Sequence, residues 1–382
     1  MQTYHQEEIM RQVSYLIKPA SSLCNLRCRY CFYEDEANNR NQKSMGVMTE
    51  QTTKLLIADA FSKVSRKGEV LFTFQGGEPT VAGIEYFRSF AEEARRSCPE
   101  GVRIRFSIQT NGTLINQEWA DFFFRERFLV GISLDGEKDL HDGNRIDPME
   151  KGTWSKVEKN AKMLLEKGVA VNALCVVTKA CARRPKTVYE SLKKIGFRYL
   201  QFIACLDPIG EKRGSMPWSL TPEAYGKFLC NLFDLWYADW EKGDYHSIRL
   251  FDDYIHLLLQ DGASTCATCG SCGEYTVVEG DGSLYPCDFF CFDQWRIGKL
   301  GEPDDKQEES RQRFLTFGSV KPEECLTCRY RPICNGGCKN DWYRDEQNAF
   351  HNYFCSSFKA LFEYALPRMM TIARAESVQR KR

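Results

Sequence analysis

Three cysteines on one short segment have the spacing of an iron–sulfur ligand set. Cys24, Cys28 and Cys31 lie four and three residues apart. Four-iron clusters normally take four cysteine ligands, so a set of three leaves one iron with an open coordination position, where metal chemistry can occur. The alternative is a zinc site with a distant fourth ligand, because cysteine pairs of this spacing also bind zinc.

A second group of cysteines lies between residues 266 and 355, which hold ten of the 18 in the chain. The pairs Cys269/Cys272 and Cys325/Cys328 have the spacing of structural zinc sites. Ten thiols with few histidines nearby nevertheless suit two four-iron clusters better. The two groups of cysteines therefore predict a catalytic domain followed by a cluster-binding module.

The amino-acid composition argues against several classes of function. Lysine plus arginine and aspartate plus glutamate both number 52, so the net charge of 0 gives no electrostatic reason to bind nucleic acid or an anionic membrane. No apolar run approaches the length of a membrane span, and residues 1–14 are too polar for a signal peptide. We expect a cytoplasmic protein, whose reduced cysteines bind metals rather than form disulfides.

Strands and helices are expected to alternate between the two groups of cysteines. Apolar runs predict strands at residues 14–18, 70–74, 104–109, 129–134, 169–177 and 200–204. Periodic segments predict helices at residues 49–67, 84–95, 117–127, 154–166, 185–194 and 222–241. Such alternation is typical of parallel βα units, which form either an open doubly wound sheet or a barrel.

Three further elements are expected outside this alternation. Residues 34–48 are polar and predict a loop, and a helix is expected near residues 252–259. Asp281 and Gly282, between two apolar runs, predict a two-stranded hairpin within the cysteine-rich region.

Polar residues follow the predicted strands. Gly76 and Gly77 come after the second strand and allow a ligand to approach the backbone closely, and the carboxylate of Glu78 could receive an ammonium group. The alternative for these three residues is an ordinary tight turn. Ser133 lies at the end of the fourth strand and Arg145 follows in a loop, and the two side chains suit a ribose and a carboxylate. Their alternative is a strand-end cap and a surface arginine.

The pattern C-x-x-x-C-x-Φ-C, in which Tyr30 is the aromatic residue Φ, resembles the signature of the radical S-adenosylmethionine enzymes. The resemblance implies a partial (β/α)6 barrel of the TIM type, with the active site at the carboxyl ends of the strands. It also implies that S-adenosylmethionine chelates the open iron and is cleaved to a 5′-deoxyadenosyl radical. The positions that match cofactor contacts of this family are Tyr30, Gly76, Gly77, Glu78, Ser133, Arg145 and Leu206.

The second group of cysteines resembles the SPASM module, which carries two auxiliary clusters, so three [4Fe-4S] clusters are implied in all. The resemblance assigns one auxiliary cluster to Cys266, Cys272, Cys287 and Cys338. It assigns the other to Cys325, Cys328, Cys334 and Cys355. Cys269 and Cys291 are left without a role, and an exchange of Cys269 for Cys266 stays open.

These resemblances divide the chain into four expected parts. The parts are a polar lead-in at residues 1–13, a radical S-adenosylmethionine barrel at 14–242, an auxiliary cluster module with a closing helix at 243–370, and a tail at 371–382.

Five segments spread over residues 14–370 resemble the anaerobic sulfatase-maturating enzymes. They are Lys18–Ser22, Phe74–Thr80, Asn231–Tyr237, Tyr285–Phe289 and Phe362–Ala365. The resemblance implies oxidation of one serine or cysteine of a sulfatase to Cα-formylglycine. Asp288 would take the proton of the hydroxyl or thiol, although a turn aspartate is the alternative. Tyr33 and Gln75 would contact the backbone of the substrate.

The implied partners follow from the same resemblance. The substrate would be an unfolded or nascent sulfatase polypeptide with a Cys/Ser-x-Pro/Ala-x-Arg motif, and the reductant a flavodoxin or ferredoxin. We expect a monomer that binds neither nucleic acid nor membrane.

Two other functions stay open at this point. A related enzyme would install a thioether or another crosslink in a ribosomal peptide, although many of those enzymes have an N-terminal recognition domain that thirteen residues could not form. An electron carrier or zinc-bound interaction module would explain the later cysteines but not Cys24, Cys28 and Cys31 together with Gly-Gly-Glu-Pro.

Overall fold

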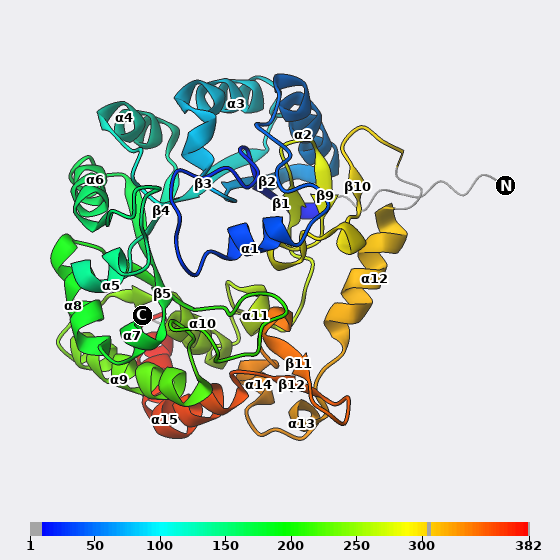
Figure 1. Cartoon of the computed structure of the whole chain (residues 1–382). Helices are drawn as coiled ribbons and strands as arrows, with labels where there is room; N and C mark the ends of the chain where they lie inside the picture. The colour runs from blue at the N-terminus through cyan, green and yellow to red at the C-terminus, as the bar shows by residue number, and fades with distance from the viewer. Residues whose placement is uncertain (1–9, 304–306, 381–382) are drawn as a thin grey trace.

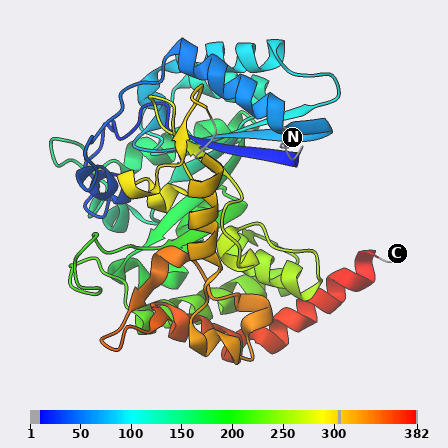
Figure 2. The same cartoon turned by 90° about the vertical axis from the view of Figure 1, so that its right-hand side faces the viewer.

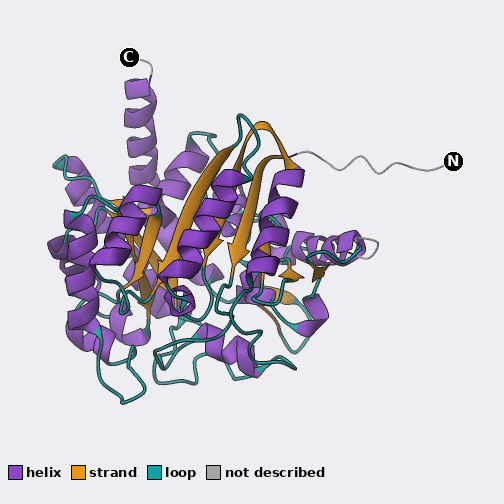
Figure 3. Cartoon of the chain, turned by 90° about the horizontal axis from the view of Figure 1, so that it is seen from above, coloured by secondary structure: helices purple, strands orange, loops and turns teal. Residues whose placement is uncertain are grey.

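The computed structural model describes residues 10–303 and 307–380. Within these residues the main sheet has ten strands in the order β10-β9-β8-β1-β2-β3-β4-β5-β6-β7. Helices form an arc outside the strands (Figure 1). The loops gather beyond the arrowheads of the strands (Figure 3), which is where the barrel interpretation places an active site.

All six predicted strands are present and pair in parallel. Their bounds are β1 Met10–Ile17, β2 Val64–Phe74, β3 Arg103–Thr110, β4 Leu129–Ser133, β5 Ala170–Val177 and β6 Tyr199–Ala204. Each strand pairs with the next one in the chain, and β7 (Ser247–Ile248) continues the parallel order beside β6. Because β7 and β10 end the sheet without pairing with each other, the barrel is partial, as predicted.

The six predicted helices are also present. Their bounds are α2 Glu50–Lys63, α3 Ile84–Arg96, α4 Gln117–Glu126, α6 Trp154–Glu166, α8 Pro185–Ile195 and α9 Pro222–Glu241. Short elements between them are η1 Pro79–Ala82, α5 Lys138–Asp142 and α7 Lys179–Ala182. Thr49 caps α2 through its side chain, as a helix-starting threonine should.

Aromatic packing fixes the carboxyl end of β2. The ring of Phe74 lies 4.9 Å from the rings of Phe87 and Phe90, which belong to α3, and all three side chains are buried. Burying a phenylalanine side chain stabilises the fold by about 1.5–3 kcal/mol. The polar residues that begin at Gln75 are therefore held by a rigid strand end.

Three predicted boundaries near the N-terminus are wrong. β1 begins at Met10 and β2 at Val64, because pairing between the two strands extends both into polar sequence and ends α2 at Lys63. Helix α1 (Phe32–Asn38) replaces part of the loop predicted at residues 34–48. Residues 1–9 of the predicted lead-in lie outside the described part of the chain.

The cysteine-rich region consists of short elements. Their bounds are α10 Arg249–Leu258, α11 Cys266–Cys269, β8 Thr276–Val278, β9 Ser283–Tyr285, η2 Asp288–Phe290, η3 Asp293–Trp295, β10 Gly298–Lys299, α12 Gln307–Ser319, α13 Glu323–Leu326, α14 Arg331–Cys334, η4 Lys339–Asp341, β11 Trp342–Arg344 and β12 Phe350–Asn352. The predicted hairpin is confirmed as β8 and β9. β8 also pairs in parallel with β1, so this region extends the barrel sheet.

The last helix, α15 (Cys355–Arg380), packs along α9 and reaches beyond the body of the molecule (Figure 2). It continues through most of the tail expected at residues 371–382, because Ile372 and Ala373 are buried. Residues 381–382 of that tail are outside the described residues. None of the described helices combines the length and apolar character that crossing a bilayer requires.

Candidate active site

The segment with the first three cysteines is held by backbone contacts from neighbouring loops. The amides of Gly77 and Glu78 donate to the carbonyls of Ser21 (2.9 Å) and Leu23 (2.8 Å). A Cβ atom on Gly77 would lie 2.3 Å from the carbonyl oxygen of Leu23. Gly77 thus allows the close approach of two backbones, one of which carries Cys24. The glycine pair therefore has a packing role that an ordinary tight turn would not have.

A cavity of about 420 Å³ opens beside this segment. Among the predicted site residues it is lined by Cys28, Tyr30, Cys31 and Leu206. Phe289 and Phe290 of the cysteine-rich region line it as well, so both parts of the chain contribute to it. A cavity of this size accommodates a small-molecule ligand.

The thiols beside this cavity hold their protons strongly in the absence of a metal. Burial raises the pKa of Cys24 to about 11 and that of Cys28 to about 12. Because iron binds thiolate, loading a cluster here must release these protons.

Arg145 is buried, which excludes the alternative of a surface arginine. Its Nε donates to Asp135 Oδ2 at 2.9 Å and its Nη2 to Oδ1 at 3.3 Å, while the Tyr30 hydroxyl also donates to Asp135. Burial, the largest single influence, raises the pKa of Asp135, but the charges of Arg145 and His141 and the hydrogen bonds from Arg145 and Tyr30 together outweigh it and keep the pKa below its usual range. Arg145 and Asp135 thereby fix Tyr30 between Cys28 and Cys31. Ser133 is half-buried at the end of β4 and is not among the residues that line the cavity.

Glu78 is buried and its carboxylate is already engaged. Oε1 accepts from the Thr80 amide (3.0 Å), the Thr80 hydroxyl (2.5 Å) and the Thr110 hydroxyl (2.6 Å). Oε2 accepts from the Asn111 amide (2.7 Å). Since a carboxylate has about four acceptor positions in all, an ammonium group of a ligand would have to share Oε2.

The eight cysteines assigned to auxiliary clusters lie at two cavities. One is lined by Cys266, Cys272, Cys287 and Cys338. The other is lined by Cys325, Cys328, Cys334 and Cys355. The structure therefore brings each predicted set of four together, although its members are far apart in the sequence.

The two unassigned cysteines do not line these cavities. The Cys269 sulfur donates to the carbonyl oxygen of Ala263 at 3.2 Å. Cys291 is fully buried, and its sulfur donates to the Cys287 carbonyl at 3.5 Å. This arrangement supports Cys266 rather than Cys269 as a ligand.

Asp288 meets Tyr33 and Gln75, as the predicted roles require. Its Oδ2 accepts from the Tyr33 hydroxyl at 2.7 Å and from Gln75 Nε2 at 3.1 Å, and Gln75 also donates to the Tyr33 hydroxyl. A turn aspartate would instead accept from nearby backbone amides, so the observed bonds to distant side chains do not fit that alternative.

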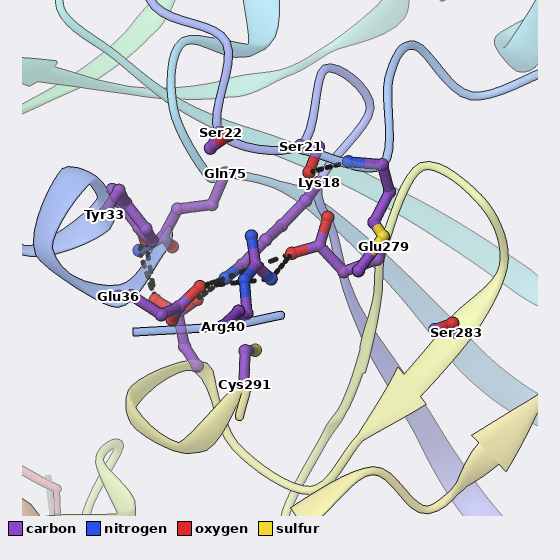
Figure 4. A network of polar contacts seen from close by, with 12 residues as sticks. Lys18, Ser21, Ser22, Tyr33, Glu36, Arg40, Gln75, Glu279, Ser283 and Cys291 are labelled. Carbon is purple, nitrogen blue, oxygen red and sulfur yellow. Dashed lines mark hydrogen bonds and ion pairs between the residues drawn. The ribbon is translucent and has the colours of Figure 1, made fainter. Parts of the chain in front are cut away.

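Sequence reasoning missed the charged residues behind Asp288. Lys18, Glu36, Arg40 and Glu279 form a buried ion cluster, in which Lys18 and Arg40 point toward the carboxylates (Figure 4). Burial lowers the pKa of Lys18, but Cys291, Asp288 and the two glutamates raise it by more, so the ammonium stays charged. The sequence contained one signal for this cluster: Lys18 lies between an apolar strand and Pro19, a position at which side chains are normally buried.

Comparison with known proteins now decides the family. The sequence pattern of the Radical SAM superfamily matches residues 19–179. The chain is 42% identical over 368 residues to the cysteine-type anaerobic sulfatase-maturating enzyme of Clostridium perfringens, covering 95% of this chain and 99% of the relative. The chain belongs to the anaerobic sulfatase-maturating enzymes.

A further relative and a solved structure give the same result. The serine-type enzyme of Bacteroides thetaiotaomicron is 30% identical and is matched over 93% of this chain and 89% of the relative. A solved structure of native anSMEcpe with bound AdoMet and Kp18Cys peptide has a TM-score of 0.89 and 41% identity, covering 95% of this chain and 99% of that one. The family predicted from the sequence is thus confirmed, and the chain is a radical S-adenosylmethionine enzyme.

The cavity linings lead to a test of the auxiliary ligand sets. Replacing Cys269 or Cys291 with serine should leave the iron content of the anaerobically reconstituted protein unchanged. Replacing Cys266 or Cys287 with serine should remove about one cluster, or about four irons. Iron analysis of the four variants measures this. Loss of iron from Cys269→Ser with retention in Cys266→Ser would reverse the assignment.

The close approach at Gly77 leads to a second prediction. Gly77→Ala should push the cysteine segment away from β2, so that about eight of about twelve irons remain and cleavage of S-adenosylmethionine is lost. Gly83→Ala is the matched control, because a Cβ there meets no atom within 4 Å and only the positive φ opposes it. Iron content and deoxyadenosine formation are the measurements. Full activity of Gly77→Ala would contradict the role given to this contact.

Proposed function

We propose that this enzyme oxidises one cysteine or serine residue of a sulfatase polypeptide to Cα-formylglycine. The observation that carries the proposal is the contact of Asp288, the neighbour of Cys287, with Tyr33, which lies two residues after Cys31. A proton acceptor of the auxiliary module thus adjoins the segment expected to bind S-adenosylmethionine. The identity to a cysteine-type enzyme over almost the whole chain supports cysteine as the preferred target.

The residues present fit the cofactors. Cys24, Cys28 and Cys31 would hold one [4Fe-4S] cluster, and the cysteines of the two auxiliary cavities would hold two more. S-adenosylmethionine would supply a 5′-deoxyadenosyl radical to take a hydrogen atom from the target Cβ, and an auxiliary cluster would accept the second electron; with a cysteine target, water would then replace the sulfur, which leaves as sulfide. Tyr30 and Leu206 line the cavity in which it would bind, while Gly76, Gly77, Glu78, Ser133 and Arg145 would support it from the surrounding strand ends.

The chain itself supplies the proton acceptor. Asp288 would take the proton of the target thiol or hydroxyl, and Tyr33 and Gln75 would orient its carboxylate through the two bonds to Oδ2. Both residues stand at the barrel mouth, where they could also meet the backbone of the peptide. Phe289 and Phe290 line the neighbouring cavity and would keep water from the reacting atoms.

We further propose the setting in which the enzyme works. A reductant of the flavodoxin or ferredoxin class would supply electrons, and the protein would act as a monomer in the cytoplasm, where its thiols stay reduced. Its organisation would be a barrel followed by an auxiliary module, with the barrel beginning at Met10 in β1, α15 reaching into the expected tail, and the two parts sharing one sheet through β1 and β8.

The proposed reaction has a direct test. The anaerobically reconstituted enzyme is incubated with S-adenosylmethionine, a reductant and a peptide containing Cys-x-Pro-x-Arg, or its serine counterpart, and the peptide is analysed by mass spectrometry. We expect an aldehyde at the target position, faster from cysteine than from serine, and deoxyadenosine in equal amount. A thioether between two residues of the peptide, without aldehyde, would contradict the proposal.

The role of Asp288 predicts a selective defect. Asp288→Asn keeps the shape of the side chain but removes its ability to accept a proton, so aldehyde formation should fall by about 10²–10⁴-fold while deoxyadenosine still forms. Cysteine peptides should be affected less than serine peptides, because a thiol is a far stronger acid than a hydroxyl.

Asp293→Asn serves as the control, since Asp293 lies on the same segment and accepts from the Asn41 amide instead. Deoxyadenosine and aldehyde are measured in parallel for both peptides. Wild-type aldehyde formation from the serine peptide by Asp288→Asn would rule Asp288 out as the proton acceptor.

A further inference from the structure

One buried ammonium lies between the carboxylate of Asp288 and the rest of the ion cluster. Lys18 Nζ is 2.8 Å from Glu36 Oε1, 3.3 Å from Asp288 Oδ1 and 3.8 Å from Glu279 Oε1. All four side chains are almost completely buried. Figure 4 shows Lys18 reaching from the end of β1 toward Glu36 of α1, with Glu279 on the other side.

The second cation of the cluster, Arg40, pairs with carboxylates other than that of Asp288. Arg40 pairs with Glu279 at 2.5 Å and with Glu36 at 3.5 Å. Within the described residues, the ion pairs of Asp288 involve Lys18 alone. The two cations therefore have different positions, Lys18 facing Asp288 and Arg40 lying behind it.

Without Lys18, the negatively charged groups around Asp288 would repel its carboxylate. Ligand atoms of Glu36, Asp288 and Cys291 all lie within 4.8 Å of one another. Two carboxylates this close, and shielded from water, repel each other strongly unless a cation lies between them. The remaining partners of Asp288, Tyr33 and Gln75, both bind Oδ2, whereas the buried Oδ1 accepts no hydrogen bond and has its ion pair with Lys18 at 3.3 Å.

We propose that Lys18 is a positioning residue for the oxidation of the substrate. Lys18 fixes Oδ1 of Asp288 while Tyr33 and Gln75 fix Oδ2, so the carboxylate meets the target side chain in a single orientation. Lys18 acts through Asp288 and anchors it to Glu36 of the barrel. This role rests on the proposed function, in which Asp288 accepts the substrate proton.

The test compares the yield of aldehyde per deoxyadenosine among variants of the reconstituted enzyme, with the cysteine peptide as substrate. Lys18→Met keeps the length of the side chain and removes its charge, so we expect this ratio to fall at least tenfold while iron content is kept. Lys18→Arg restores the charge and should recover most of the ratio. Arg40→Met is the matched control: it removes an equally buried cation that does not contact Asp288, and its ratio should stay within twofold of wild type.

Two results would overturn the proposal: an unchanged ratio in iron-loaded Lys18→Met, or an equal fall in Arg40→Met. If Lys18→Met does not fold, the double variant Lys18→Met/Asp288→Asn is measured instead, because it removes one positive and one negative charge and so leaves no unpaired charge at this position. Its ratio should equal that of Asp288→Asn alone, because coupled residues are not additive, and a further tenfold fall would overturn the proposal. A wild-type ratio for Asp288→Asn would instead show that the proposed proton acceptor itself is wrong.

Discussion

The arrangement of the candidate site depends on the desolvated charge of Lys18. Removing an ammonium group from water costs several kcal/mol, and the cost is offset only when carboxylates surround it in good geometry. Here the carboxylates come from α1, from the β8–β9 connection and from the segment after β9, which carry Glu36, Glu279 and Asp288. Breaking such a buried pair typically costs 3–5 kcal/mol. The ion pairs of Lys18 with Asp288 and Glu36 therefore resist any movement that would separate Asp288 from the barrel.

The sheet places these charges where they can meet. β8 pairs in parallel with β1, so that Ile17 lies beside Val278, and the amide of Lys18 donates to the Val278 carbonyl at 2.8 Å. The chain then turns through Glu279 into β9 and delivers Cys287 and Asp288 to the same end of the sheet. The cysteine-rich region is thus an extension of the barrel sheet, which brings Cys287, the proposed cluster ligand, and Asp288, the proposed proton acceptor, to the end of β1.

The sequence was sufficient for features that depend on local pattern. Apolar strands and helix caps predicted the six βα units, and the resemblance to the SPASM module implied the two sets of four cysteines that the two cavities bring together. The sequence was insufficient where the local structure depends on the burial of polar residues. The polar segment at residues 34–48 predicted a loop, yet Glu34–Glu36 lie within helix α1, where Lys18 pairs with the buried Glu36. Arg145 is buried for the same reason, since Asp135 pairs with it.

The central claim is that Asp288, held by the Lys18 cluster, faces the residue being oxidised. The most direct measurement is an anaerobic crystal structure of the iron-loaded enzyme with S-adenosylmethionine and a cysteine-containing sulfatase peptide. This account predicts the target sulfur within hydrogen-bond distance of the Asp288 carboxylate, with the Lys18–Asp288 pair intact. A target side chain directed away from Asp288, while Asp288 keeps its bonds to Tyr33 and Gln75, would contradict it.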